Sequence, residues 1–91
     1  MEFDWDDNKN ALNRSKHNID FRDALAVFFD NYAIVREDNN RRNETRMHIC
    51  GKSRAGILLV VYVELKEDSI RLISARKAGR PELRAYEQGH F

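Results

Sequence analysis

Cationic side chains recur in this sequence where regular structure is expected, and they are the residues best suited to chemistry. They fall on a first predicted helix, on a predicted strand and after the last predicted strand: Lys9, Lys16 and His17; Arg46 and His48; Arg76, Lys77 and Arg80. Positive side chains gathered on one surface attract a polyanion such as a nucleic acid. The alternative is that these side chains simply form part of the solvated surface, as most exposed charged residues do.

Residue types needed for several other chemistries are absent or badly spaced. Cys50 is the only cysteine, and His17, His48 and His90 lack the i, i+4 or CxxC spacing at which ligands converge on one metal ion. The sequence also has no glycine-rich loop before a helix and no local signature of an activated Ser or Cys nucleophile. We therefore expect a function that uses neither a metal ion nor another cofactor.

Arg76 is the best-placed phosphate ligand in the sequence. It lies near the end of a predicted strand and shortly before a helix that starts at Pro81. A guanidinium fork and the free backbone N–H groups of a helix N terminus act together on an anion. Strict alternation along the strand puts Arg71 on the face opposite Arg76.

The first elements that position these side chains are a strand and two helices. Phe3 and Trp5 alternate with acidic residues, which indicates a short edge strand, and Asp6 or Asp7 can cap a helix that runs to Lys16. The residues expected to form the narrow packing face of that helix are Ala11, Leu12 and Ser15. After a left-handed turn at Asn18, a second amphipathic helix has its apolar positions at Phe21, Ala24, Leu25 and Phe28.

The rest of the chain reads as four strands and a final helix. The predicted strands are residues 32–35, 45–50, 57–65 and 70–75, separated by a loop at 37–43 and by turns at 51–56 and 66–69. Residues 57–65 are almost continuously apolar, which is typical of a central strand. Pro81 and Gly89 frame the last helix.

The resulting order, β-α-α-β-β-β-β-α, predicts an α+β fold with an antiparallel sheet meander and the helices packed on one side. With 91 residues and 42% hydrophobic content, the chain has material for one core, so we expect a single domain over residues 1–91. The longest apolar run, residues 57–63, is far short of the roughly 20 residues of a membrane helix. Together with the single cysteine, this favours a cytoplasmic protein without a membrane partner.

Three stretches of the sequence together resemble the BrnT toxins. They are Phe3-x-Trp5-Asp6-x-x-Lys9-x-x-x-Asn13-x-x-Lys16-His17-x-Ile19-x-Phe21, then Ala26-Val27-Phe28-x-Asp30, and Ile70-Arg71-x-Ile73-Ser74-Ala75-Arg76-x-Ala78. The likeness extends to Glu44-x-Arg46, Gly51 and Gly56-x-Leu58-Leu59-Val60-Val61, so it covers nearly the whole chain. Asn18 departs from the Gly that is common in the family, and Pro81 from a position that is often charged.

The resemblance implies a RelE-like ribonuclease fold and the toxin role in a type II toxin–antitoxin system. It also implies a metal-independent endoribonuclease that cleaves RNA and inhibits translation. A BrnA-type antitoxin is expected to neutralise it, and operator DNA is expected to be contacted only through the complex of the two proteins.

Metal-independent cleavage requires removal of the 2′-OH proton, stabilisation of the phosphorane and protonation of the 5′-oxygen leaving group. By resemblance and chemistry together, Lys16 or His17 is expected to transfer protons, while Arg46 and Arg76 clamp the phosphate. The expected RNA-binding residues are Trp5, Lys9, Lys77 and Arg80. Two alternatives stay open: Trp5 can belong to the core, and His17 can serve its helix C terminus, where positive charge is favourable.

The main rival is a non-catalytic nucleic-acid-binding or adaptor module, in which the same cations neutralise phosphates and no bond is broken. A partner-binding domain without an RNA role is the remaining alternative, and it leaves the cationic face unexplained. Cleaved RNA ends and growth arrest on induction separate the toxin from both.

Overall fold

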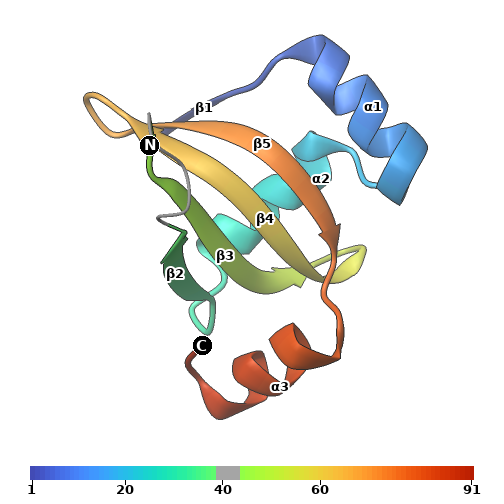
Figure 1. Cartoon of the computed structure of the whole chain (residues 1–91), viewed down its shortest axis with the longest axis vertical. Helices are drawn as coiled ribbons and strands as arrows, with labels where there is room; N and C mark the ends of the chain where they lie inside the picture. The colour runs from blue at the N-terminus through green and yellow to red at the C-terminus, as the bar shows by residue number, and fades with distance from the viewer. Residues whose placement is uncertain (39–43) are drawn as a thin grey trace.

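The computed structural model describes residues 1–38 and 44–91, which are built around a five-stranded sheet (Figure 1). Four strands form an antiparallel meander: β2 (Ile34–Asp38), β3 (Arg46–Ser53), β4 (Gly56–Leu65) and β5 (Ser69–Lys77). β1 (Glu2–Asp4) pairs in parallel with β5, which gives the spatial order β1-β5-β4-β3-β2. The predicted meander, the edge position of the first strand and the central position of β4 are confirmed.

The helices follow the predicted order. α1 (Asp7–His17) comes after β1, α2 (Phe21–Ala24) continues into the 3-10 helix η1 (Leu25–Phe29), and α3 (Arg80–Gln88) follows β5. Asp6 caps α1, and Asn18 closes it in the left-handed conformation with φ 59°. The α+β class and the element order are therefore confirmed. None of the helices in the described residues is long and apolar enough to cross a membrane.

The main core lies between one face of the sheet and the helical segment α2–η1, which sits behind the sheet in Figure 1. Its largest fully buried side chains include Phe21, Val27, Leu58, Val60 and Leu72. Burying an apolar side chain of this size stabilises the fold by about 1.5–3 kcal/mol. Packing of the main core therefore stabilises the sheet, and the sheet in turn fixes the positions of the side chains on the opposite face of β3–β5.

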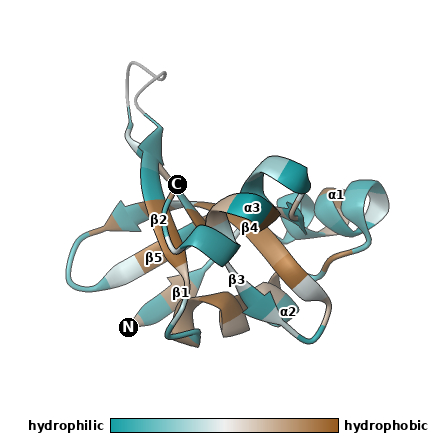
Figure 2. Ribbon diagram, turned by 90° about the horizontal axis from the view of Figure 1, so that it is seen from below, coloured by the Kyte–Doolittle hydropathy of each residue, from teal (hydrophilic) through white to brown (hydrophobic). Residues whose placement is uncertain are grey.

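α3 covers one end of the opposite face, where a second, smaller core lies beneath it. Ile34, Cys50, Leu59 and Ala85 are buried there. The expectation of helices on one side holds for α2 and η1, whereas α3 packs on the other face. The reason is local. Leu58 and Val60 of β4 face the main core, and Leu59 between them faces the other way, so this second apolar surface needs a cover of its own. In Figure 2, β4 belongs to the hydrophobic part of the ribbon.

α1 packs against the sheet edge through asparagines rather than through apolar residues. Asn13 Nδ2 donates to the carbonyl oxygens of Ala75 (2.8 Å) and Ile19 (2.9 Å), and Asn13 Oδ1 accepts from the Ala75 N–H (3.0 Å). Asn10 Oδ1 accepts from the Phe21 N–H at 2.9 Å. The expected packing face is wrong, since its three members are exposed: Ala11, Leu12 and Ser15.

Some element boundaries also differ from expectation. Residues 37 and 38 belong to β2 instead of a loop, and the rest of that expected loop, residues 39–43, lies outside the described residues. β3 continues through Ser53, so the turn before β4 is shorter than residues 51–56. Charged residues are compatible with a strand that has one open face, so polarity alone does not end it.

Candidate functional site

The sheet face opposite α2 and η1, beyond the part that α3 covers, carries polar and charged side chains, and we call it the open face. Ile49, Val60 and Tyr62 face the main core, so their neighbours along β3 and β4 point the other way. Strand register arranges this side of the sheet in rows. On the open face, one row is Arg36, His48, Val61 and Ser74, and the neighbouring pairs are Asp38 with Arg46 and Val63 with Arg71. The next row begins with the buried Ile34, Cys50 and Leu59 beneath α3 and ends at Arg76. The meander thus gathers cations from β2, β3 and β5.

A β-bulge decides which residues of β5 share the open face. Val61 pairs with Ser74 and Tyr62 pairs with Leu72, so Ile73 is an extra residue without a partner position on β4. An extra residue shifts the alternation by one. Arg71 therefore lies on the same face as Ser74 and Arg76, which corrects the expectation that Arg71 and Arg76 face opposite ways.

His48 lies within this face with both ring nitrogens engaged. Arg36 Nε–H donates to His48 Nδ1 (3.1 Å), and His48 Nε2 lies 3.5 Å from Asp38 Oδ2. Because a guanidinium can only donate, Nδ1 is unprotonated and the proton of the neutral ring is on Nε2, facing Asp38. Burial and the charge of Arg36 lower the pKa of His48 below its ordinary value, although Asp38 acts in the opposite direction. The ring is therefore neutral near pH 7.

Arg76 is paired with a carboxylate at the start of α3. Arg76 Nη1 donates to Glu82 Oε1 (3.1 Å) and to the carbonyl oxygen of Lys77 (3.2 Å), and Glu82 Oε1 also accepts from the Gly79 N–H (2.7 Å). Burial alone would raise the pKa of Glu82, but the Gly79 N–H and the Arg76 guanidinium outweigh it and lower that pKa. The arginine and the helix N terminus expected to hold a phosphate already hold Glu82, so a phosphate must compete with it.

Arg46 reaches a shallow hollow between α1 and the β5 edge. The residues around this hollow include Lys9, Lys16, His17, Arg46, Ile73 and Ser74. Three predicted catalytic residues, Lys16, His17 and Arg46, are thus brought together. The fourth, Arg76, follows Ser74 by two positions on the open face of β5.

The Arg46 side chain is held in place while part of it stays available. Its Nε donates to Glu44 Oε1 (3.0 Å), and 20% of the side chain is exposed. A guanidinium has five N–H donors, so this one bond leaves others for a phosphate.

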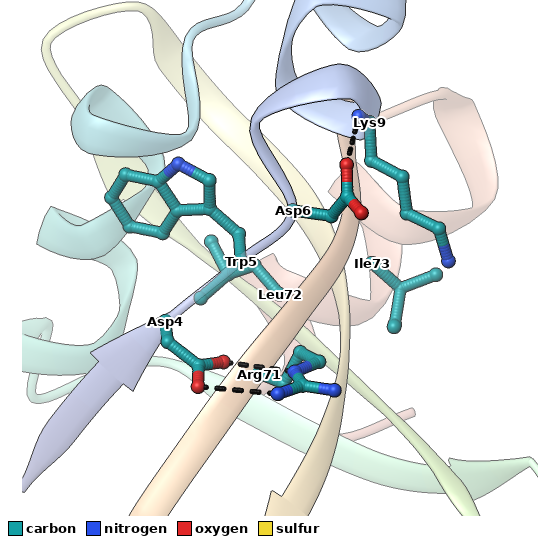
Figure 3. A pocket seen from close by; sticks show the side chains of 7 residues that line it. All are labelled: Asp4, Trp5, Asp6, Lys9, Arg71, Leu72 and Ile73. Atoms are coloured by element: carbon teal, nitrogen blue, oxygen red, sulfur yellow. Dashed lines mark hydrogen bonds and ion pairs between the residues drawn. The ribbon is translucent and has the colours of Figure 1, made fainter.

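A second hollow adjoins the first at Lys9 (Figure 3). Arg71 lines it and donates two hydrogen bonds to Asp4, at 3.0 and 3.4 Å. Trp5 also lines this hollow, but Figure 3 shows its ring directed away from Lys9 and Arg71. The ring packs edge-on against Phe21, with the centroids 5.9 Å apart. This contact favours the core role of Trp5 over base stacking.

The last two predicted RNA-binding residues lie near α3. Lys77 pairs with Leu58, whose side chain is in the main core, so the register position of Lys77 is on the face opposite that of Arg76. Arg80 is exposed in the first turn of α3. Lys77 is therefore not brought together with the cations of the open face.

Sequence reasoning missed several residues of the open face. Arg36 and Asp38 continue the alternation that begins at Ile34, and this i, i+2 pattern could have revealed them had the polar stretch not been read as a loop. Alternation along β5 does place Ser74 on the same face as Arg76, but its residue type gives no signal of a role at the site. His48 was noted as a cation without a role.

Metal ligation has no candidate site in the described part of the chain, where no group of three His, Cys, Asp or Glu side chains is arranged to hold an ion. Cys50 lies beneath α3 with its Sγ 3.9 Å from the Glu82 carbonyl oxygen. Burial, followed by the charge of Glu82, raises the pKa of the Cys50 thiol. The thiol is therefore protonated at neutral pH and acts as a core side chain.

The fold and the open face define a small α+β protein with a cationic surface beside an α1 hollow. Residues 5–82 match the family of ribonuclease toxins of type II toxin–antitoxin systems described as BrnT. The chain belongs to the BrnT family, as its sequence motifs indicated.

A solved structure agrees with this assignment at the level of the fold. The crystal structure of the ribonuclease toxin BrnT of Brucella abortus is similar to this chain with a TM-score of 0.66 and 23% sequence identity. The similarity covers 88% of this chain and 99% of that chain. No curated protein matches the sequence. The RelE-like relation that the resemblance implied stays a prediction.

Proposed function

We propose that this chain, acting as one domain over residues 1–91, is a metal-independent endoribonuclease toxin that inhibits translation in the cytoplasm. Membership of the BrnT family supports the class of protein and its type II toxin role. The observation that carries the chemistry is the convergence of Arg46 with Lys16 and His17 at one hollow, beside the open-face residue Arg76.

The chemistry is transesterification within the RNA. The 2′-oxygen loses its proton to a base and bonds to phosphorus, the bond from phosphorus to the 5′-oxygen breaks, and an acid protonates that oxygen. The products carry a 2′,3′-cyclic phosphate and a 5′-OH. Arg46 and Arg76 stabilise the negative charge on the phosphorane, and Lys16 or His17 transfers protons at the α1 side. Lys9 and Arg80 guide the RNA backbone.

A BrnA-type antitoxin is the proposed partner, and it neutralises the toxin by covering this face or an adjoining edge. The cations that bind RNA also attract an acidic partner segment. Operator DNA is contacted through the complex with the antitoxin rather than by the toxin alone.

The test is induction of this chain alone in a bacterium, followed by mapping of RNA ends. The wild type should arrest growth and yield 5′-OH ends, whereas the double variant Lys16→Ala, Arg76→Ala should do neither. The matched control is the double variant Lys66→Ala, Arg54→Ala, which removes the same charges from exposed positions in two turns. Arrest by the first double variant at equal expression would remove Lys16 and Arg76 from the mechanism.

A passive RNA binder is the second candidate, and one observation favours it. Arg46 and Arg76 are already paired with carboxylates of the chain, Glu44 and Glu82. Such pairs can hold a basic face in place without any chemistry. A binder of this kind would shift RNA in a gel and leave its ends intact, so the same end mapping distinguishes the two.

A further inference from the structure

His48 and Arg46 occupy neighbouring positions on the open face of β3. They are two residues apart on one strand, which separates their Cα atoms by roughly 7 Å along the strand. Arg46 also borders the hollow that contains Lys16 and His17. A phosphate bound at Arg46 therefore has His48 on one side and the α1 cations on the other. Cleavage of RNA needs a base and an acid on opposite sides of the reacting phosphorus.

The ring of His48 is prepared for the role of base. Its Nδ1 lone pair accepts from Arg36, and its Nε2 faces Asp38. A carboxylate at the second nitrogen fixes the tautomer and stabilises the imidazolium that forms when the first nitrogen takes a proton. The charged groups that act on the ring are Arg36 and Asp38 from β2 and Arg76 from β5. Arg46 occupies the next open-face position of β3, and β4 contributes the apolar Val61.

Arg36 is placed so that RNA can draw it off the ring. The residue is exposed, and its guanidinium carbon lies 4.3 Å from the centroid of the Phe91 ring, which holds the side chain near the site. A phosphate is a stronger acceptor for a guanidinium than a neutral imidazole is, because the bond is between two charges.

Building on the proposed function, we propose that His48 is the general base of RNA cleavage and that Arg36 guards its Nδ1 until an RNA phosphate takes the arginine. The RNA phosphate then binds the Arg36 guanidinium, and this same step frees His48 Nδ1, the nitrogen that removes the proton from the 2′-OH. His48 Nδ1 accepts the 2′-OH proton, the 2′-oxygen bonds to phosphorus, and the bond to the 5′-oxygen breaks. Lys16 or His17 donates the proton that the 5′-oxygen takes up.

The first test compares His48→Gln with the control Lys66→Gln, which changes an exposed residue in the turn between β4 and β5. On an RNA oligonucleotide that the wild type cleaves, His48→Gln should lose about 10²-fold or more in rate and the control should lose little. His48→Ala should regain cleavage when imidazole is added, which a merely structural role would not produce. Near wild-type cleavage by folded His48→Gln overturns the proposal while leaving the ribonuclease assignment intact. A wild type that cleaves no RNA overturns the proposed function itself.

A second test separates the base from the acid. An RNA whose scissile 5′-oxygen is replaced by sulfur releases its leaving group without protonation. Lys16→Ala or His17→Gln should regain rate on this substrate, whereas His48→Gln should stay slow. Recovery of His48→Gln on the sulfur substrate would make His48 an acid and contradict the proposal.

A third test retains His48 and removes the arginine that binds its Nδ1. In the free protein Arg36 lowers the pKa of His48, so Arg36→Ala should shift the acidic limb of the kcat/KM profile, which reports the free protein, to higher pH. An acidic limb that stays in place in Arg36→Ala would show that the titrating base is a different group.

Discussion

The Asn13 side chain takes the place of a neighbouring strand for Ala75: it donates to the Ala75 carbonyl oxygen (2.8 Å) and accepts from the Ala75 N–H (3.0 Å). β1 pairs with β5 only as far as Arg71, and α1 covers the edge beyond it. The exposed edge of the sheet is thereby closed. The same contact holds the last turn of α1, with its candidate proton-transfer residues, against the open face.

Replacing Asn13 by Ala should lower the free energy of unfolding by about 3 kcal/mol. The substitution leaves the N–H and carbonyl of Ala75 and the carbonyl of Ile19 without this partner, and a buried unsatisfied group costs about 1–3 kcal/mol. Urea unfolding followed by circular dichroism measures the change. Asn8→Ala is the control, because Asn8 is exposed on the same helix. Equal stability of the two variants would contradict the role assigned to Asn13.

The fold could be predicted from the sequence to the extent that apolar periodicity determines it. The apolar run 57–65 predicted the central strand, and the spacing of Phe21, Ala24 and Phe28 predicted the helical cover of the main core. The packing of α1 could not be found in this way, because Asn13 contacts Ala75, 62 positions along the chain, through hydrogen bonds rather than apolar contacts.

The candidate site was predicted in part. Lys16, His17 and Arg46 were named from motifs, and they do meet at one hollow. The place of Arg71 was not predictable, because one extra residue at Ile73 reverses the alternation and no local signal marks it. The partner of Arg76 was missed for a similar reason: Glu82 meets Arg76 only because the turn at Gly79 folds α3 back on the strand.

Lys9 and Lys77 should differ in their contribution to RNA binding, although both are exposed lysines. Lys9 borders both hollows, whereas the register position of Lys77 is on the other face of the sheet. Lys9→Gln should therefore reduce the slope of log affinity against log salt by about 0.7, the value for one phosphate contact on a single strand, and Lys77→Gln should leave it unchanged. Fluorescence anisotropy with 2′-O-methyl RNA, which cannot be cleaved, measures both slopes. A larger decrease in the slope for Lys77→Gln than for Lys9→Gln would mean that RNA binds the face of the sheet opposite the open face.

Tyr86→Phe should make the protein less stable at neutral pH and less sensitive to alkali. Tyr86 donates to Asp30 Oδ2 at 2.6 Å, and this bond raises the pKa of Tyr86 to about 12. The stabilisation is complete below the ordinary pKa near 10 and is lost as pH rises through about 12.

At pH 7 the loss in Tyr86→Phe should be about 2 kcal/mol, as for a hydrogen bond to a charged group. Chemical unfolding at pH 7 and pH 11 measures both effects, with Tyr32→Phe, an exposed tyrosine, as the control. If Tyr86→Phe and the wild type lose the same stability between these pH values, the Asp30 contact is not the cause.

Gly51→Ala should destabilise the fold by about 2 kcal/mol. A Cβ at this position would lie 2.8 Å from Val27 Cγ1 and 3.1 Å from the Val27 carbonyl oxygen, so β3 or η1 must shift. Overpacking of a core typically costs about 1–3 kcal/mol. Thermal unfolding measures the loss, and Lys52→Ala, at the next and exposed position of β3, serves as the control. An unchanged midpoint for Gly51→Ala would show that β3 has room to move away from η1.

Glu82→Gln should lower the stability of the fold and raise the affinity for RNA, because the Glu82 carboxylate both caps α3 and pairs with Arg76. Loss of the charged cap at the Gly79 N–H should cost about 1 kcal/mol of stability. The same change releases Arg76 from its ion pair, so an RNA phosphate no longer competes with an internal anion. Affinity for 2′-O-methyl RNA should rise about two- to fivefold at low salt, the scale of one partly exposed pair.

Glu87→Gln removes the same charge from an exposed position of α3 and separates this local competition from a general change in net charge. If both variants raise RNA affinity equally, Arg76 is not the phosphate ligand that Glu82 holds. If Glu82→Gln alone raises it, the carboxylate and the RNA compete for one guanidinium. The energy that binds RNA at Arg76 is then the difference between two ion pairs, so the toxin binds RNA less tightly than its open-face charges alone would allow.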